Sequence, residues 1–169
     1  TVFVTPARLI ENLKGILNFF FFFFNENSKK SLFFIAGDGV DHQLYELFIR
    51  NNNLESNIKL LGFKNSEQMN ELYNEANVML LPSFYDPSPL SLVEATKMGL
   101  VILSSKHCGN SIECVLPGKN GESFDPLDAV EIKEKYEKLL SDIDNWGMYS
   151  IRSKKIYSDK FAPEQVITN

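Results

Sequence analysis

The stretch that decides the fold covers residues 78–94 and reads VMLLPSFYDPSPLSLVE. Its first four residues, 78–81, are all apolar and predict a buried strand, which the following Pro-Ser pair ends. The next residues predict a tight loop that carries Asp86. Residues 88–98 then predict a largely apolar helix, with Glu94 in its second turn and Gly99 at its end.

Two carboxylates, Asp86 and Glu94, lie eight positions apart around this loop. The N-terminus of a helix attracts anions through its free N–H groups and its dipole. Carboxylates accept hydrogen bonds from sugar hydroxyls. The segment therefore predicts a site for a phosphorylated ligand that is rich in hydroxyl groups.

Strands and helices are expected to alternate along the rest of the chain. The expected strands are 1–5, 31–36, 58–61, 78–81, 100–103 and, at an edge, 122–124. The expected helices include 12–25, 88–98, 110–116 and 144–160. Fully apolar strands that alternate with amphipathic helices predict a doubly wound, Rossmann-like α/β domain with a parallel sheet covered on both faces. Ligands of such folds bind at the carboxyl ends of the strands, here the loops 5–8, 37–41, 62–66, 82–88 and 104–110.

Three polar residues are expected to cap helices: Asp41, Ser66 and Asp128. Apolar spacing then assigns each of these helices a buried face. The expected faces are Leu44, Leu47 and Phe48 on the first, Met69, Leu72, Tyr73 and Ala76 on the second, and Ile132, Tyr136, Leu139 and Leu140 on the third.

Six consecutive phenylalanines occupy residues 19–24. Read as a helix, the run places Phe20, Phe21 and Phe24 in the core with Ile16 and Leu17, while Phe19, Phe22 and Phe23 point elsewhere. A strand is the alternative interpretation of the run. The outward rings are expected to pack under a neighbouring helix or stay partly exposed; contact with a further domain, a second chain or a membrane surface is the sharper alternative. The run is well short of the ~20 residues that a membrane span needs.

Composition limits the function classes. The 169 residues suggest one domain, and the net charge of −5 argues against a nucleic-acid-binding surface. Cys108 and Cys114 show neither a disulfide framework nor metal spacing, which favours a reducing, cytoplasmic location. His42 and His107 are single histidines, expected at a helix start and in a loop. Because the chain begins directly with a strand-like segment, we expect residues 1–169 to be one domain of a longer protein.

The segment around Asp86 and Glu94 resembles the E-x7-E motif of retaining glycosyltransferases with the GT-B fold, the large family-4 type. In that family a strand ending in Pro-Ser leads into a P-L-x-L-x-E-A helix, which residues 89–95 match. Residues 98–102 are similar to the family's G-x-P-V-I strand. Weaker matches follow in the expected order at residues 6–15, 37–39, 61–63, 72–76 and 118–121.

The resemblance implies that the chain is the C-terminal, nucleotide-sugar-binding half of a GT-B enzyme. Such an enzyme transfers a hexose to an acceptor hydroxyl with retention and without a metal or other cofactor. The donor would be a nucleotide diphosphate sugar such as a UDP- or GDP-hexose, and the pathway that the resemblance implies is polysaccharide or surface-glycan assembly. The acceptor would bind an N-terminal domain, so the isolated chain should bind donor and transfer little. The full-length protein would be cytoplasmic or in peripheral contact with the inner face of the membrane.

By the same resemblance, Arg8 and Lys14 would hold the diphosphate and stabilise the leaving group. Asp86, the third residue expected to act in catalysis, would contact the transferred sugar, although the family pattern has Glu at this position. Glu94 would bind the ribose.

Backbone N–H groups near Leu90 and Ser91 would face the phosphates. Phe63 and Lys64 would border the base, with plain core as the alternative for Phe63. Two further functions remain open at this point: a non-catalytic GT-B-like module that binds a nucleotide or a partner, and a nucleotide-sugar epimerase-like domain.

Overall fold

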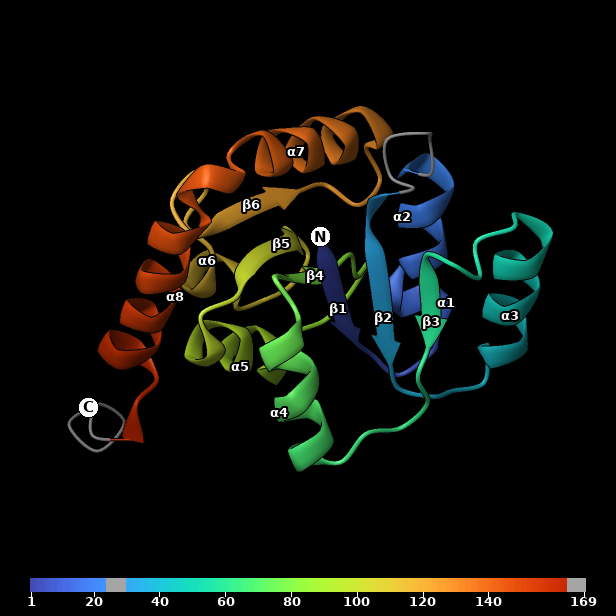
Figure 1. Ribbon diagram of the computed structural model, residues 1–169, viewed down its shortest axis with the longest axis horizontal. Coiled ribbons are helices and arrows are strands. Elements are labelled where there is room, and N and C mark those ends of the chain that lie inside the picture. The colour runs from blue at the N-terminus through green and yellow to red at the C-terminus, as the bar shows by residue number, and fades with distance from the viewer. Residues whose placement is uncertain (24–29, 164–169) are drawn as a thin grey trace.

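The computed structural model describes residues 1–23 and 30–163 (Figure 1). Its strands are β1 (Val2–Pro6), β2 (Leu32–Ala36), β3 (Ile58–Leu60), β4 (Val78–Leu81), β5 (Val101–Ser105) and β6 (Gly121–Phe124). Its helices are α1 (Glu11–Lys14), α2 (Ile16–Phe23), α3 (His42–Asn51), α4 (Ser66–Glu75), α5 (Leu90–Met98), α6 (Ser111–Cys114), α7 (Ala129–Ser141), the 3-10 helix η2 (Ile143–Asn145) and α8 (Trp146–Lys160).

The six strands form one parallel sheet in the order β3-β2-β1-β4-β5-β6. This order confirms the doubly wound, Rossmann-like fold predicted from the sequence. The chain winds outward from β1 to one edge and then returns to β4 beside β1. The loops after β1 and β4 therefore leave the sheet in opposite directions and open a crevice between them, which is the topological switch point.

Alternate side chains of the central strands enter two separate cores, as a buried parallel sheet requires. In β4, Val78 and Leu80 belong to the core under α2, α3 and α7. Met79 and Leu81 belong to the core under α4, α5 and α6. All four side chains are at most 1% exposed, so a polar residue anywhere in this strand would be buried.

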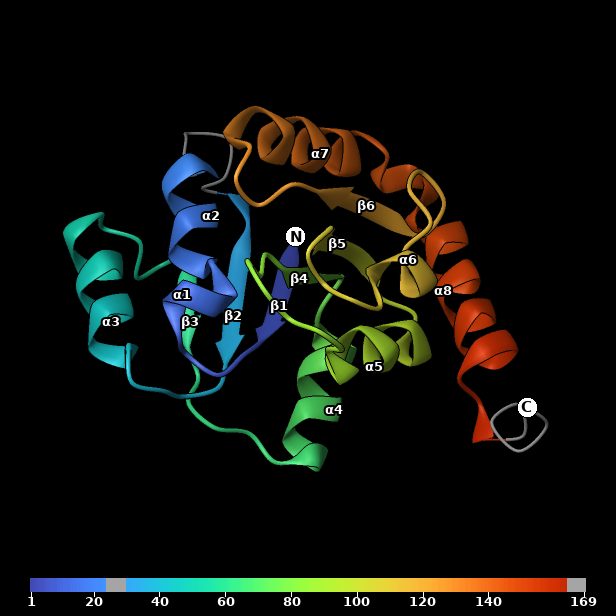
Figure 2. The ribbon, with the colours of Figure 1, turned by 180° about the vertical axis from the view of Figure 1, so that it is seen from behind.

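The helices cover the sheet from edge to edge. Figures 1 and 2, which view the molecule from opposite sides, both show α3 beside β3 at one edge and α7 along β6 at the other. Helix α8 packs against α5, which fixes the motif helix from its outer side. Among the residues that the structure describes, no helix combines the length and apolar character needed to cross a lipid bilayer.

The single helix expected over 12–25 is wrong, because Gly15 interrupts it with a left-handed φ of 57°. Because α2 begins anew at Ile16, the phenylalanine side chains face other directions than they would in one continuous helix. Phe19 and Phe20 are fully buried, whereas Phe21 is 74% exposed and Phe22 is 41% exposed. The core position expected for Phe20 is therefore confirmed. The core position expected for Phe21 and the outward position expected for Phe19 are both wrong. Phe24 lies outside the described residues, and only the backbone of Phe23 is described.

Two of the predicted caps also differ from the structure. Helix α4 is capped by Asn65 rather than Ser66, in a reciprocal capping box with Gln68. Asp41 does occupy the predicted N-cap position of α3, but its side chain makes no capping bond and accepts a 2.8 Å hydrogen bond from the Glu11 N–H instead. Asp128 does cap its helix, because its carboxylate accepts bonds from the N–H groups of Val130 and Glu131 at 2.9 and 3.0 Å.

Helix α3 buries a different face from the one its leucines suggest. Tyr45 and Ile49 are buried, whereas Leu44 and Leu47 are about half exposed. Tyr45 can enter the core because its hydroxyl donates a 2.6 Å hydrogen bond to Glu11, a partner that lies 34 residues away in the sequence. The expected inner faces of α4 and α7 are confirmed: Tyr73, Ala76, Ile132, Tyr136 and Leu139 are all buried.

Candidate functional site

A cavity of about 560 Å³ opens at the switch point between β1 and β4. Its walls come from the loops after β1, β2, β3 and β4, from α4 and from the start of α5. The residues that line it are Pro6, Ala7, Arg8, Lys14, Ala36, Gly37, Asp38, Phe63, Lys64, Met69, Asp86, Pro89 and Ser91. Six of the eight site residues predicted from the sequence are in this group.

The floor of the cavity contains an ion pair between the two halves of the sheet. Lys14 Nζ donates a 2.5 Å hydrogen bond to Asp86 Oδ2. The two side chains are only 17% and 15% exposed, so water screens their attraction less than it would at the surface. Asp86 neutralises Lys14 in this state, and an anionic ligand would have to share the lysine with it.

The position of Lys14 follows from the break between α1 and α2. Gly15 takes the left-handed conformation, and a Cβ on it would lie 2.8 Å from the carbonyl oxygen of Pro82. The chain therefore passes close under the loop that carries Asp86, which a larger residue would prevent. Glu11 caps the start of α2 by accepting bonds from the N–H groups of Leu17 and Asn18 at 3.1 and 3.0 Å.

Glu11 also anchors α1 to the neighbouring helix. Its carboxylate accepts the hydroxyl of Tyr45, and its N–H donates to Asp41. Burial raises the pKa of Tyr45 far above its ordinary value, and the hydrogen bond with the Glu11 carboxylate raises it further. Tyr45 therefore stays a neutral donor, and the four-residue α1 is held at both ends.

Charge in the cavity is mixed. Arg8, Lys14 and Lys64 supply three positive charges, and Asp38 and Asp86 supply two negative ones. Arg8 is exposed and forms no ion pair with any residue in 1–23 or 30–163. Since Lys14 is paired with Asp86, Arg8 and Lys64 are the cations more available to an incoming anion, and Arg8 alone offers a bidentate fork.

The start of α5 also contributes to the wall of the cavity. Its N-cap, Pro89, provides no side-chain cap, so no capping side chain bonds the N–H groups of the first turn, which also lack the usual intrahelical partners. Ser91 lines the cavity, whereas the Leu90 side chain is 72% exposed and does not. Any contribution of Leu90 to the site therefore comes from its backbone, as the sequence prediction assigned it.

Glu94 lies outside this cavity, in a smaller one of about 220 Å³ that shares Lys64 and Met69 with it. Glu94 is exposed, although it lies in the largely apolar helix expected over residues 88–98. Its carboxylate is nevertheless fixed, since Oε2 accepts a 2.7 Å hydrogen bond from the hydroxyl of Tyr73.

Tyr73 is the residue that the sequence assigned to the core without a role. It is 3% exposed. Burial raises its pKa well above the ordinary value, and the hydrogen bond to the Glu94 carboxylate adds to the effect. The sequence did carry a signal, because a tyrosine on a buried helix face needs a partner for its hydroxyl. It did not indicate that the partner is Glu94.

The remaining predicted residues, Phe63 and Lys64, follow β3. Phe63 is 79% exposed and lines the cavity, so the core interpretation of this ring is wrong. Lys64 borders both cavities. Asp38, which was not predicted to belong to the site, joins it through the loop after β2, where it accepts the Gly39 N–H at 2.7 Å.

Comparisons with known proteins agree with this architecture. A family model described as "Glycosyl transferases group 1" matches residues 2–155. A 2-deoxystreptamine N-acetyl-D-glucosaminyltransferase from Niallia circulans is 26% identical over 137 residues, which cover 81% of this chain and 35% of that protein. The chain thus spans well under half of this curated relative.

Two solved structures are similar in fold. Anabaena Alr3699/HepE in complex with UDP superimposes with a TM-score of 0.80 at 20% identity, over 95% of this chain and 44% of that one. The pneumococcal O-GlcNAc transferase GtfA, solved with UDP and GlcNAc, gives a TM-score of 0.80 at 20% identity, over 98% of this chain and 34% of that one. The parallel sheet and the family match over residues 2–155 together show that the chain belongs to the group 1 glycosyl transferases, with the fold of one half of a GT-B enzyme.

Proposed function

We propose that the cavity at the switch point binds the diphosphate of a nucleotide sugar. In this proposal the chain is the donor-binding part of an enzyme that transfers a hexose to an acceptor hydroxyl with retention. The observation that carries the proposal is the convergence of Arg8, the Lys14–Asp86 pair and the uncapped start of α5 on one cavity.

Phosphate oxygens would be bound from three directions. Arg8 offers a bidentate fork, Lys14 offers a point charge, and the first turn of α5 offers N–H groups and the positive end of its dipole. As the glycosidic bond breaks, negative charge grows on the leaving diphosphate, and these groups would stabilise it. The proposed transfer uses these cations in place of a metal ion.

The sugar and the ribose would lie on either side of the diphosphate. Asp86 would accept hydrogen bonds from hydroxyls of the transferred sugar once Lys14 turns toward phosphate. Glu94, oriented by Tyr73, would accept those of the ribose. Lys64 borders both cavities, and with Phe63 it would border the base.

Uridine is the nucleoside that we propose, because the two similar structures described above are complexes with UDP. The resemblance to the family favours polysaccharide or surface-glycan assembly in the cytoplasm as the pathway. The acceptor would bind a second domain, since the chain spans only 35% of the relative from Niallia circulans. The isolated chain is therefore expected to bind donor and to transfer little sugar.

Calorimetric titration with UDP, GDP and ADP, and with the corresponding hexose conjugates, tests the proposal. We expect the UDP series to bind, and the hexose conjugate to bind more tightly than UDP alone. Equal affinity for UDP and UDP-hexose would favour a non-catalytic nucleotide-binding module. If none of these compounds binds while circular dichroism shows a folded chain, the proposal is refuted.

A further inference from the structure

The loop after β5, residues 106–110, runs alongside the segment that carries Asp86. The Gly109 N–H donates a 2.9 Å hydrogen bond to the carbonyl of Asp86, and the Asp86 N–H points toward the carbonyl of His107 at 3.5 Å. Asp86 and Cys108 accordingly form an isolated parallel bridge. A Cβ on Gly109 would lie 1.9 Å from the carbonyl oxygen of Pro87, so only glycine permits this approach.

Two side chains of the same loop contact residues before and after Asp86 in the sequence. His107 Nδ1 lies 3.1 Å from the carbonyl oxygen of Phe84. A carbonyl oxygen only accepts, so Nδ1 carries the hydrogen. Asn110 Nδ2 donates a 2.9 Å bond to the carbonyl of Pro89, which is the N-cap of α5. The loop therefore bonds to Phe84, which lies two residues before Asp86, and to Pro89, which directly precedes α5.

Asn110 itself is buried, and its Oδ1 has no hydrogen-bond partner among residues 1–23 and 30–163. An unpaired buried acceptor lowers stability. Only one of the two polar atoms of the Asn110 amide is therefore paired within these residues, and it is the donor to Pro89 at the start of α5.

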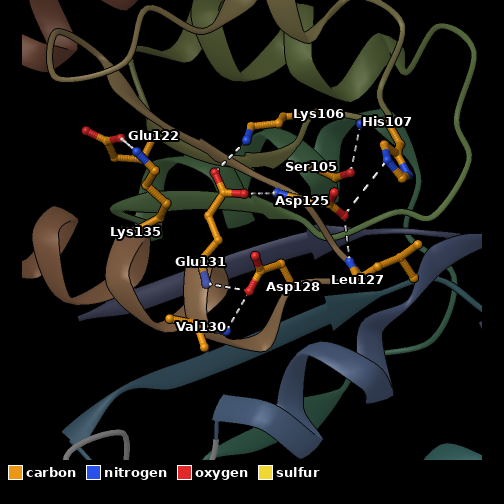
Figure 3. Close-up of polar contacts among 10 residues, drawn as sticks. All are labelled: Ser105, Lys106, His107, Glu122, Asp125, Leu127, Asp128, Val130, Glu131 and Lys135. Atoms are coloured by element: carbon orange, nitrogen blue, oxygen red, sulfur yellow. Dashed lines mark hydrogen bonds and ion pairs between the residues drawn. The ribbon is translucent and has the colours of Figure 1, made fainter.

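The other ring nitrogen of His107 faces the end of β6 (Figure 3). His107 Nε2 lies 4.0 Å from Asp125 Oδ1. The Asp125 N–H donates a 3.1 Å bond to Glu131, whose other carboxylate oxygen accepts a 2.5 Å bond from Lys106. The His107 imidazole therefore lies between the segment after β4, to which it is hydrogen-bonded, and the Asp125 carboxylate at the end of β6.

We propose that His107 and Asn110 are positioning residues for the donor site. His107 sets the backbone that presents the Asp86 carboxylate, and Asn110 sets the first turn of α5 that faces phosphate. Neither residue lines the cavity at the switch point, so both act through other groups. The assignment to a donor site depends on the proposed function, whereas the positioning of Asp86 can be measured without any ligand.

The test compares His107→Asn with His107→Gln. An asparagine amide nitrogen lies close to the place of Nδ1 and keeps the bond to Phe84, whereas a glutamine amide extends toward the place of Nε2. The first readout is amide hydrogen exchange of Gly109, followed by NMR in the free protein. We expect exchange about tenfold faster in the glutamine variant and close to wild type in the asparagine variant.

The second readout is affinity for UDP-glucose by calorimetry. We expect His107→Gln and Asn110→Ala each to lose about tenfold, and His107→Asn to retain most of the wild-type affinity. Ile112→Ala is the control, because this 83% exposed side chain follows the loop directly; it should change neither readout. A circular dichroism spectrum identical to wild type excludes general unfolding.

Two results separate this inference from the proposed function. Wild-type exchange at Gly109 in His107→Gln, with unchanged donor affinity, would overturn the positioning role. Faster exchange at Gly109 in a chain whose wild type binds no nucleotide sugar would support the positioning of Asp86 and refute the proposed function.

Discussion

Lys14 Nζ donates a 2.5 Å hydrogen bond to Asp86 Oδ2, which joins the segments that follow β1 and β4 across the switch point of the sheet. The pair has two consequences for a ligand. In the proposed function, the diphosphate would draw Lys14 away from Asp86, and the carboxylate that this movement frees would become available to the sugar. Phosphate binding and sugar binding should therefore be coupled through this pair.

Replacing Lys14 should weaken nucleotide binding. Lys14→Met keeps much of the buried stem and removes the charge, so we expect a loss of about 1.5–3 kcal/mol of UDP binding, the worth of a hydrogen bond to a charged group. Calorimetry measures it. Lys133→Met on α7, an exposed lysine, is the matched control and should bind as wild type does. Equal affinity in the two variants would show that Lys14 does not contact the ligand.

Replacing Asp86 should have opposite effects on two ligands. Asp86→Asn releases Lys14, so we expect UDP to bind more tightly, by about 0.5–1.5 kcal/mol. The hexose conjugate should lose the advantage it has over UDP in the wild type, because the amide accepts sugar hydroxyls less strongly than the carboxylate. Parallel titrations of the two ligands measure the difference. A uniform loss for both ligands would contradict the coupling through this pair.

Tyr73 should matter for affinity beyond its part in the core. Tyr73→Phe removes the 2.7 Å bond to Glu94 and leaves that carboxylate unrestrained, so we expect about tenfold weaker UDP binding. Tyr136→Phe is the control, because it also removes a buried tyrosine hydroxyl, one that lies 3.0 Å from the Ser31 hydroxyl. Both variants should lose similar stability in urea, and only Tyr73→Phe should lose affinity. Comparable affinities in both variants would exclude a role for the Tyr73–Glu94 bond.

Substitutions at neighbouring positions of the phenylalanine run should have very different effects on the free energy of unfolding. Phe20 is fully buried and Phe21 is 74% exposed. We expect Phe20→Ala to cost about 3–5 kcal/mol of unfolding free energy and Phe21→Ala to stay within about 0.5 kcal/mol of wild type. Urea unfolding measures both. Similar losses in the two variants would mean that α2 does not have the phase described above.

The sequence predicted the architecture because the central strands are unambiguous. Val78 to Leu81 are apolar at every position, which only a sheet covered on both faces accommodates. For most elements, the predicted first residue therefore lies within two residues of the first residue in the structure. The cavity residues Arg8, Lys14 and Asp86 were also predicted together, because the carboxyl ends of parallel strands meet at one edge.

What the sequence missed depends on partners that are distant along the chain. Tyr45 enters the core through its bond to Glu11, and Tyr73 holds Glu94. Local apolar spacing carries no information on either bond. The phase of the phenylalanine run was missed for a similar reason, because Gly15, where the helix breaks, lies against the carbonyl of Pro82 in another loop.

The two cysteines should be unreactive in the native protein. Burial raises the pKa of Cys108 to about 11 and that of Cys114 to about 12, from an ordinary value of 9.0. Both are thiols at pH 8, so iodoacetamide should label them slowly in buffer and rapidly in urea, as mass spectrometry can follow. Stoichiometric labelling of the native protein at pH 8 would contradict their burial.

The same shifts give a pH dependence of stability. The folded state holds these two protons more tightly than the unfolded chain does. The stability contributed by Cys108 and Cys114 is therefore complete below pH 9 and falls as the pH rises toward 11. In the variant Cys108→Ala/Cys114→Ala, the urea midpoint should fall less over this interval than it does in the wild type. An equal fall in both proteins would assign the alkaline loss to other groups.

The central claim is that the cavity between β1 and β4 binds the diphosphate of a nucleotide sugar. Titration of the isotope-labelled chain with UDP, followed by amide chemical shifts in NMR spectra, tests it most directly. We expect saturable shifts at Ala7, Arg8, Lys64 and Ser91, and unchanged amides at the β3 edge around Lys59, where a separate cavity of about 320 Å³ lies. Saturable shifts confined to the β3 edge, or no saturable shifts in a folded chain, would contradict the account.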